Sequence, residues 1–283
     1  MSIPSALRTL GAALLLTVAV VGLTAWTPNP APVSPDRAVM PAAPGPVPEY
    51  AENGMVVSAK RRASEAGVAM LKKGGNAVDA AVATGFALAV VHPYAGNIGG
   101  GGFMVIRRPD GSVTTIDHRE NAPSGATQGI YLDEDGNAVR ERSRRGYLAS
   151  GVPGSVAGLL KALDAYGTLD RATVMRPAIR LAREGFPMSH ELATELNERY
   201  EVFAEFPATQ RYFTKGDSTK KYRAGEPFVQ KDLARTLERI RRNGRDEFYE
   251  GKTASLIAEQ FQDNGGLITE EDLAEYQAVE REP

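Results

Sequence analysis

The spacing of apolar residues predicts where folded structure begins. Met55-Val56-Val57 is a short apolar run that suits a β-strand. Ala63, Ala66 and Met70 follow at helical spacing, so they share one face of a predicted helix, which Gly74-Gly75 ends. We therefore expect a strand followed by an amphipathic helix at the start of the fold.

A second helix is predicted over residues 77–91. Asn76 is a favourable cap, and Asp79 lies in the first turn, near the positive end of the helix dipole. The helix carries a single charge, is apolar on all sides, and ends at His92-Pro93. It is too short and too rich in alanine to span a bilayer, so we expect it to be buried in the protein core.

A β-hairpin is predicted after a run of four glycines at residues 99–102. Phe103–Ile106 is expected to form one strand and Val113–Ile116 the returning strand, with turn residues at Pro109-Asp110-Gly111 between them. The charged cluster Asp117–Glu120 comes directly after the returning strand. It is therefore expected at the rim of a sheet, where clefts form.

Beyond Ser150-Gly151 the pattern is mainly helical. A second hairpin is predicted around Asp135-Gly136, and a strand begins at Tyr276–Val279, close to Pro283. Because a strand needs partners, we expect the chain to be cut short or completed by another polypeptide. The predicted helices, most of them followed by glycine, are Ser155–Tyr166, Thr173–Glu184, Ser189–Tyr200, Lys231–Asn243, Thr253–Asn264 and a short one starting at Thr269 with Asp272.

The first fifty residues indicate targeting. Arg8 is the only charge before the apolar stretch Leu10–Ala25, which is shorter than the ~20 residues of a membrane-spanning helix. We predict an export signal at 1–26, with an uncleaved anchor as the alternative, and an extended, proline-rich tether at 27–50. The folded domain is then 51–283, and the protein is expected to be periplasmic or secreted, with no membrane attachment after signal removal.

Charge and composition exclude several functional classes. A formal net charge of -2 over 283 residues gives no electrostatic basis for binding nucleic acid. The chain has no cysteine, which excludes disulfides, thiol nucleophiles and thiolate metal sites. His92, His118 and His190 are the only histidines, so we expect neither a histidine-rich metal site nor a cofactor.

Arg119 is the candidate binding residue in the charged cluster. A guanidinium can hold a carboxylate through two parallel hydrogen bonds, although a salt bridge with Asp117 or Glu120 is the alternative. Alternation along the strand directs His118 away from Arg119, so a structural or surface role is expected for the imidazole. The glycines at 99–102 either cradle an anion or make a tight connection, and the residues alone leave both possibilities open.

Five segments, in order, resemble a known family. They are GGNAVDAAVATGFALAVVHPYAGNIGGGGFMVIRR, TTIDHRENAP, LASGVPGSVAGLLKALDAYGTL, RPAIRLAREGFPMS and DEFYEGKTASLIAEQFQDNGGLITEEDLAEYQAVEREP. Over Met55–Pro283 the chain closely resembles the gamma-glutamyltranspeptidases, or glutathione hydrolases. Members of that family are exported precursors that cleave themselves into a large and a small subunit.

The resemblance implies an α/β (α+β) fold and a substrate-binding residue. The two subunits would form the four-layer αββα fold of the N-terminal nucleophile hydrolases, which is incomplete without the small subunit. The family's nucleophile is a threonine in a Thr-Thr-His-aromatic-Ser context; here Thr114-Thr115 is followed by Ile116, so the nucleophile is expected beyond this chain. In the family's Asp-aromatic-Arg-Glu segment the arginine grips the α-carboxylate of the γ-glutamyl group, and it corresponds to Arg119, with His118 at the aromatic position.

The implied function is hydrolysis or transfer of γ-glutamyl groups from glutathione and related compounds. The threonine, with its own α-amine as base, would form a γ-glutamyl ester that water or an amine then resolves. The chain alone is expected to be inactive. Two alternatives stay open: a glutaryl-type β-lactam acylase of the same fold, and a noncatalytic remnant that serves as a carboxylate-binding or interaction module.

Overall fold

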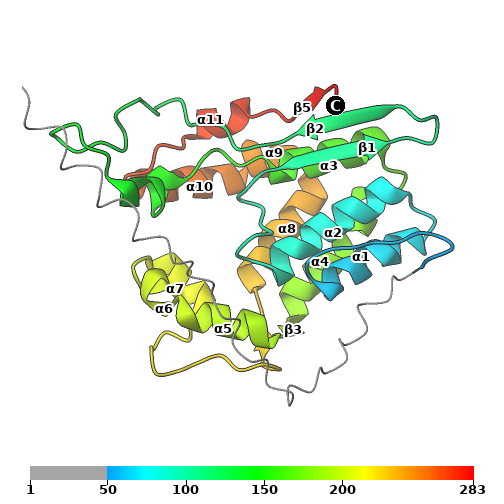
Figure 1. The fold of residues 1–283 in the computed structure, drawn as a ribbon, viewed down its shortest axis with the longest axis horizontal. Helices are drawn as coiled ribbons and strands as arrows, with labels where there is room; N and C mark the ends of the chain where they lie inside the picture. The colour runs from blue at the N-terminus through cyan, green and yellow to red at the C-terminus, as the bar shows by residue number, and fades with distance from the viewer. Residues whose placement is uncertain (1–49) are drawn as a thin grey trace, which may run out of the picture. The chain divides into compact units, whose positions relative to one another are not determined.

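Eleven α-helices and two small sheets make up the described part of the chain in the computed structural model, which describes residues 50–283 (Figure 1). The predicted export signal, its anchor alternative and the tether up to residue 49 lie outside the described residues. Within residues 50–283, none of the helices has both the length and the hydrophobicity needed to cross a membrane.

The helices and strands are as follows. The helices are α1 (Arg61–Leu71), α2 (Ala77–Val91), α3 (Ser155–Tyr166), α4 (Arg171–Glu184), α5 (His190–Glu198), α6 (Tyr200–Ala204), α7 (Pro207–Phe213), α8 (Lys231–Asn243), α9 (Arg245–Tyr249), α10 (Lys252–Asp263) and α11 (Glu270–Glu275). The strands are β1 (Phe103–Arg107), β2 (Val113–Asp117), β3 (Phe186–Pro187), β4 (Pro227–Phe228) and β5 (Val279–Arg281). Two 3₁₀ turns are η1 (Arg140–Ser143) and η2 (Tyr147–Ala149).

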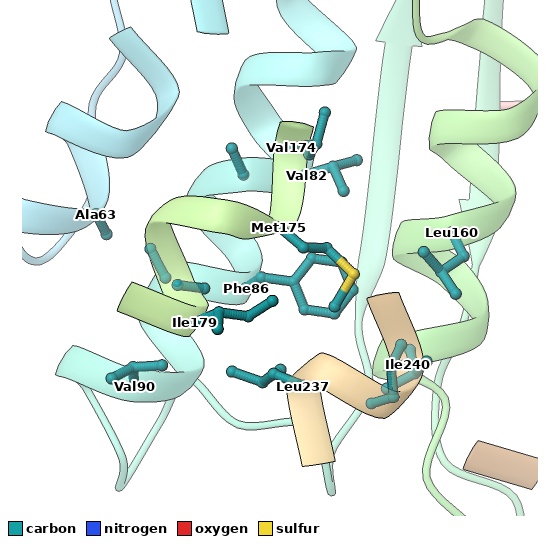
Figure 2. Close-up of a cluster of buried hydrophobic side chains, with 14 of the residues drawn as sticks. Ala63, Val82, Phe86, Val90, Leu160, Val174, Met175, Ile179, Leu237 and Ile240 are labelled. Atoms are coloured by element: carbon teal, nitrogen blue, oxygen red, sulfur yellow. The ribbon is translucent and has the colours of Figure 1, made fainter. Parts of the chain in front are cut away.

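Helix α2 lies at the centre of the core, as its apolar sequence predicts. It packs against α1, α3 and α4, and α4 in turn packs against α8. Val82, Phe86 and Val90 of α2 are fully buried, and Figure 2 shows the Phe86 ring beside Met175 of α4. Because most of the surface of α2 meets other helices, an apolar helix without a polar face is the stable choice at this position.

Asp79, the single charged residue of α2, helps to cap the N-terminus of the helix. The Asn76 side chain accepts hydrogen bonds from the Val78 and Asp79 amides, and the Asp79 carboxylate accepts one from the Asn76 amide at 2.7 Å. The same carboxylate accepts bonds from the Thr168 hydroxyl at 2.7 Å and the Leu169 amide at 3.0 Å. Asp79 therefore ties the start of α2 to the connection between α3 and α4.

Asp79→Asn is expected to lower the free energy of unfolding at pH 7 by about 1.5–3 kcal/mol, because hydrogen bonds to a charged acceptor are lost. Burial of Asp79 opposes ionisation, but the hydrogen bonds from Leu169, Thr168 and Asn76 outweigh it and hold the carboxyl pKa below its ordinary value of 3.8. The unfolded state therefore takes up a proton first as the pH falls. The stabilisation is complete above pH 3.8 and is lost as the pH falls from there through the lowered pKa.

Urea denaturation between pH 7 and pH 3 measures this effect. The difference between wild type and Asp79→Asn should shrink over the acid end of that range. Asp164, exposed on α3, provides the matched control, and Asp164→Asn should change stability by less than about 0.5 kcal/mol. A wild-type advantage over Asp79→Asn that stays constant down to pH 3 would contradict the assignment.

The larger sheet has the order β1-β2-β5, with both pairs antiparallel. Phe103 and Val279 both lie opposite Asp117, one on each side of β2. The predicted hairpin is confirmed. The final strand begins at Val279, three residues later than the predicted start at Tyr276, because the Tyr276 side chain is buried and stacks on Tyr249 at a ring-centre distance of 5.5 Å.

The two faces of this sheet differ in burial. Ile106 and Ile116 point into the core on the side of α3, where they are 8% and 0% exposed. On the other face, Phe103 is 60% and Val105 66% exposed, and Val279 is 43% exposed. The described residues therefore leave this face uncovered, with its exposed apolar side chains beside the Asp117–Arg281 ion pair.

Three sequence predictions are corrected by the structure. Met55–Val57 has no regular secondary structure and pairs with no strand among residues 50–283; of the three residues, only Val56 packs on the core. The second hairpin is reduced to a single bridge between Leu132 and Ala138 around the turn. The helix predicted over 189–200 ends at Glu198, and α6 follows as a separate short helix.

Candidate functional site

Arg119 comes two residues after β2 ends, at the rim of the larger sheet. The backbone there is held by the flanking chain: the His118 amide donates to the Gly102 carbonyl at 2.9 Å, and the Gly102 amide donates to the His118 carbonyl at 3.2 Å. The Asp117 carboxylate accepts a hydrogen bond from the Arg119 amide at 3.1 Å. Arg119 thus leaves the sheet from a fixed backbone position.

Tyr276 holds the other side of this backbone. Its hydroxyl donates to the Arg119 carbonyl at 2.8 Å. Burial, with smaller contributions from Asp117 and Glu120, raises the pKa of Tyr276 to about 12, so the hydroxyl keeps its proton at neutral pH. Sequence reasoning placed Tyr276 in a strand and did not predict this contact, because the two residues are far apart along the chain.

The Arg119 guanidinium faces solvent. The side chain is 64% exposed, and its Nε lies 3.3 Å from Oε2 of Glu120, which is 34% exposed. Its Cζ lies 6.0 Å from the centre of the Phe103 ring. An ion pair this exposed contributes little stability, so the guanidinium can exchange Glu120 for a ligand carboxylate.

Asp117 does not compete for the guanidinium of Arg119. Its second carboxylate oxygen accepts a hydrogen bond from Nε of Arg281 on β5 at 2.8 Å. The Arg119 amide and then the Arg281 side chain hold the pKa of the Asp117 carboxyl below its ordinary value, so it is ionised at neutral pH. Of the two acidic partners considered from the sequence, only Glu120 pairs with the Arg119 side chain.

His118 points into the core, on the side of the strand opposite to Arg119. It is 8% exposed, and a Cβ atom on Gly158 of α3 would lie 2.2 Å from its Cγ. Burial lowers the pKa of the His118 imidazole, so the ring is neutral at physiological pH. The structural role that strand alternation predicts for this histidine agrees with its position.

The glycine run makes a tight connection. The Gly100 carbonyl accepts hydrogen bonds from the Gly154 and Ser155 amides, at 2.8 and 2.9 Å, at the start of α3. A Cβ atom on Gly101 would lie 2.4 Å from the His118 carbonyl oxygen, so no larger residue fits there. The sequence left two possibilities open, an anion cradle and a tight connection. These contacts support the tight connection, which packs β1 and α3 closely together next to Arg119.

Possible metal ligands do not cluster in the described part of the chain. Within residues 50–283, no three carboxylate or imidazole side chains gather closely enough to hold a metal ion. What the described residues offer at this site is a positioned guanidinium, Arg119, with the carboxylate of Glu120 beside it.

The chain was compared with protein families, curated proteins and solved structures. Residues 63–283 match the family model for gamma-glutamyltranspeptidase. The chain is 51% identical over 238 residues to the glutathione hydrolase proenzyme of Escherichia coli strain K12, which covers 83% of this chain and 40% of that protein. It therefore spans about two fifths of the length of that relative.

Two solved structures are similar in both fold and sequence. The crystal structure of Helicobacter pylori gamma-glutamyltranspeptidase aligns with a TM-score of 0.81 at 47% identity, over 84% of this chain and 68% of that chain. Cephalosporin acylase from Bacillus halodurans aligns with a TM-score of 0.74 at 31% identity, over 86% of this chain and 46% of that chain. The mixed α/β fold expected from the sequence is thus confirmed.

Proposed function

The chain belongs to the gamma-glutamyltranspeptidase family, and we propose that it is the large-subunit portion of an exported glutathione hydrolase that acts in the periplasm or outside the cell. The proposed reaction is hydrolysis or transfer of the γ-glutamyl group of glutathione and related compounds. The proposed partner is a small subunit that carries the threonine nucleophile. The two would be made as one precursor, with this domain at 51–283 preceded by the export signal and the tether.

The observation that carries this proposal is the position of Arg119. Its backbone is fixed on two sides, by the Asp117 carboxylate and the Tyr276 hydroxyl, while its guanidinium is 64% exposed. A rigidly based, solvent-facing guanidinium can hold the α-carboxylate of a glutamyl group through two hydrogen bonds. Anchoring that end of the substrate fixes the position of the γ-carbonyl, where the reaction occurs.

Glu120 favours a γ-glutamyl substrate over a glutaryl substrate. Its carboxylate lies 3.3 Å from the Arg119 guanidinium, so it stands beside the place proposed for the substrate carboxylate. A γ-glutamyl group carries an ammonium on the same carbon as its α-carboxylate, and a glutaryl group does not. A carboxylate next to the guanidinium therefore matches the charge pattern of an amino acid.

The uncovered sheet face supports the proposed partner. Phe103, Val105, Val113 and Val279 lie on this face and are each at least 39% exposed. Apolar sheet faces are stable when a second layer covers them, and two stacked sheets lie about 10 Å apart. We propose that a sheet of the small subunit packs here, which would complete the αββα arrangement and bring the threonine to the rim that carries Arg119.

The proposed chemistry proceeds in two acyl-transfer steps. The threonine hydroxyl attacks the γ-carbonyl, its proton passes to the α-amine of the same threonine, and the amine leaving group departs with that proton. This leaves a γ-glutamyl ester on the threonine. Water then releases glutamate, or an amine acceptor forms a new γ-glutamyl amide, and the threonine is regenerated. Throughout, Arg119 would hold the α-carboxylate in place.

Co-expression of this chain with a threonine-led small subunit tests the proposal. We expect the pair to turn over a γ-glutamyl amide and the chain alone to be inactive. A small subunit whose leading threonine is replaced by alanine is the control, and it should also be inactive. Absence of turnover from a correctly assembled wild-type pair would contradict the proposed function and would favour the noncatalytic carboxylate-binding or interaction module.

The acylase alternative has one observation in its favour, the similarity to cephalosporin acylase at 31% identity. Parallel kinetics on a γ-glutamyl amide and the matching glutaryl amide separate the two. We expect kcat/KM to be higher for the γ-glutamyl amide, because only that substrate offers an ammonium group to Glu120. A preference for the glutaryl amide would favour the acylase.

A further inference from the structure

A groove lined by arginines runs between α4 and α8, away from Arg119. Its volume is about 420 Å³. We call it the arginine groove and define it by its charged residues, which are Arg176, Arg180, Arg183, Glu184, Glu238 and Arg241. Four guanidinium groups thus face two carboxylates in one surface depression, and the gamma-glutamyl chemistry proposed above uses none of them.

The helical repeat of α4 places the arginines on one side. Arg176, Arg180 and Arg183 are spaced four and three residues apart, and all three are exposed. The opposite side of the helix is apolar: Val174 and Ala178 are 0% exposed, and Figure 2 shows Val174 among the buried side chains of the core. The arginines therefore form a continuous basic stripe along one edge of the groove.

The Glu238 carboxylate pairs with two of the four guanidinium groups in the groove, and also with Arg242 outside it. Glu238 pairs with Arg241 at 2.6 Å, with Arg242 at 3.1 Å and with Arg183 at 3.8 Å. Among the described residues, neither Arg176 nor Arg180 has a side-chain ion pair or hydrogen bond. The groove thus carries unbalanced positive charge, although the whole chain has a formal net charge of -2.

The helix dipole does not explain this charge. Arginines near a helix C-terminus are favourable, which accounts for Arg183 in α4 and for Arg241 and Arg242 in α8. Arg176 and Arg180 lie in the middle of α4, where the dipole has little effect. Like charges four residues apart destabilise a helix, so a bound anion between these two side chains would relieve repulsion.

We propose that the arginine groove binds a phosphate-type oxyanion, with Arg176 and Arg180 as its principal ligands. A guanidinium offers parallel N–H donors that match phosphate oxygens, and two neighbouring guanidinium groups can share one such anion. The carboxylates of Glu184 and Glu238 lie in the same groove and would repel a long polyanion. No aromatic side chain of the described residues lines the groove, so base stacking, which nucleic-acid sites use, has no platform here.

The phosphate could belong to a soluble molecule or to a lipid headgroup, and the experiment separates these sources. Isothermal titration of the full chain with inorganic pyrophosphate, at constant ionic strength, measures the soluble arm. Co-sedimentation with vesicles of phosphatidylglycerol, compared with vesicles of phosphatidylcholine, measures the lipid arm. Screening of exposed charges by salt makes the constant ionic strength essential.

Arg176→Gln/Arg180→Gln is expected to weaken binding at least about tenfold, since two charge-assisted contacts are lost. Arg176→Lys/Arg180→Lys keeps the charge but not the paired donors, so a loss of about threefold is expected. The matched control is Arg140→Gln/Arg144→Gln, which removes the same charge from two exposed arginines of the 140–145 loop. Its affinity should stay within about twofold of wild type.

The two binding assays and the two double variants together distinguish a soluble ligand, a lipid ligand and no specific site. Pyrophosphate binding that is lost in Arg176→Gln/Arg180→Gln and kept in the control supports a soluble phosphate ligand. The same variant pattern on phosphatidylglycerol vesicles, without pyrophosphate binding, supports a lipid headgroup. Equal weakening in the two double variants, or no binding in either arm by a folded wild-type chain, overturns the proposal. Thermal unfolding of each variant verifies that it is folded.

Discussion

Replacing Arg119 with alanine is expected to reduce kcat/KM for a γ-glutamyl amide roughly 10- to 150-fold, which corresponds to a charged hydrogen-bonding contact of about 1.5–3 kcal/mol. The reason is that the α-carboxylate loses the guanidinium proposed to hold it, while the reacting carbonyl keeps its chemistry. The measurement is steady-state kinetics on this chain assembled with the proposed small subunit. The affinity for free L-glutamate, measured as competitive inhibition, should fall by a similar factor.

Two further variants make this result specific. Arg119→Lys keeps the charge but loses the paired donors, so its kcat/KM should lie between those of wild type and Arg119→Ala. Arg61→Ala removes an arginine that is 92% exposed on α1 and should leave the kinetics unchanged. Arg119→Ala kinetics equal to those of Arg61→Ala would show that Arg119 does not bind the substrate.

The second large effect concerns stability. Phe86→Ala is expected to lower the free energy of unfolding by about 3–5 kcal/mol, because it removes a large side chain from a closed part of the core and leaves a cavity. Phe86 is 0% exposed, and helices α4 and α8 enclose it together with the rest of α2 (Figure 2). Chemical denaturation of the full chain, followed by circular dichroism, measures the loss.

Phe103→Ala is the matched control, since it makes the same chemical change at a position that is 60% exposed. It should change the stability of the chain by less than about 0.5 kcal/mol. Similar losses in the two variants would mean that the core is not centred on α2.

Local pattern predicts the helical part of this fold well. The expected limits of the helices 155–166 and 231–243 coincide with α3 and α8, because a glycine ends each helix. The predicted cap and the apolar character of α2 agree with its buried position. These elements are set by residues within a few positions of one another, which is the information that a sequence pattern carries.

Elements that depend on distant contacts are predicted less well. Met55–Val57 has the composition of a strand, but a strand exists only where a partner backbone is available. The short helices α7 and α9 have too few residues to show an apolar period, although Pro207 at the first position of α7 is a start signal. Tyr276, which binds the backbone of Arg119, lies 157 residues away in the sequence, so no local pattern points to it.

In the candidate site, too, some features follow from local sequence pattern and others depend on distant contacts. The position of Arg119 at a strand end follows from the hairpin pattern, and the orientation of His118 follows from strand alternation. The pairing of Asp117 with Arg281 could not be predicted from local pattern, because it requires β5 to lie beside β2. From the sequence alone, only the family resemblance suggests a role for Arg119, since an arginine in a charged cluster has no distinctive signature of its own; its position in the structure then supports that role.

The open face of the sheet also bears on how the protein is made. Phe103 and Val105 are exposed apolar side chains on β1, the outer strand of the sheet. Exposed apolar surface on an outer strand promotes aggregation of newly synthesised chains. A covering layer supplied on the same polypeptide would be present at an effective concentration in the millimolar range, far above that of a separate protein. In the proposed precursor, the covering layer would thus shield this surface during folding, and cleavage after folding would be favoured over cleavage before it.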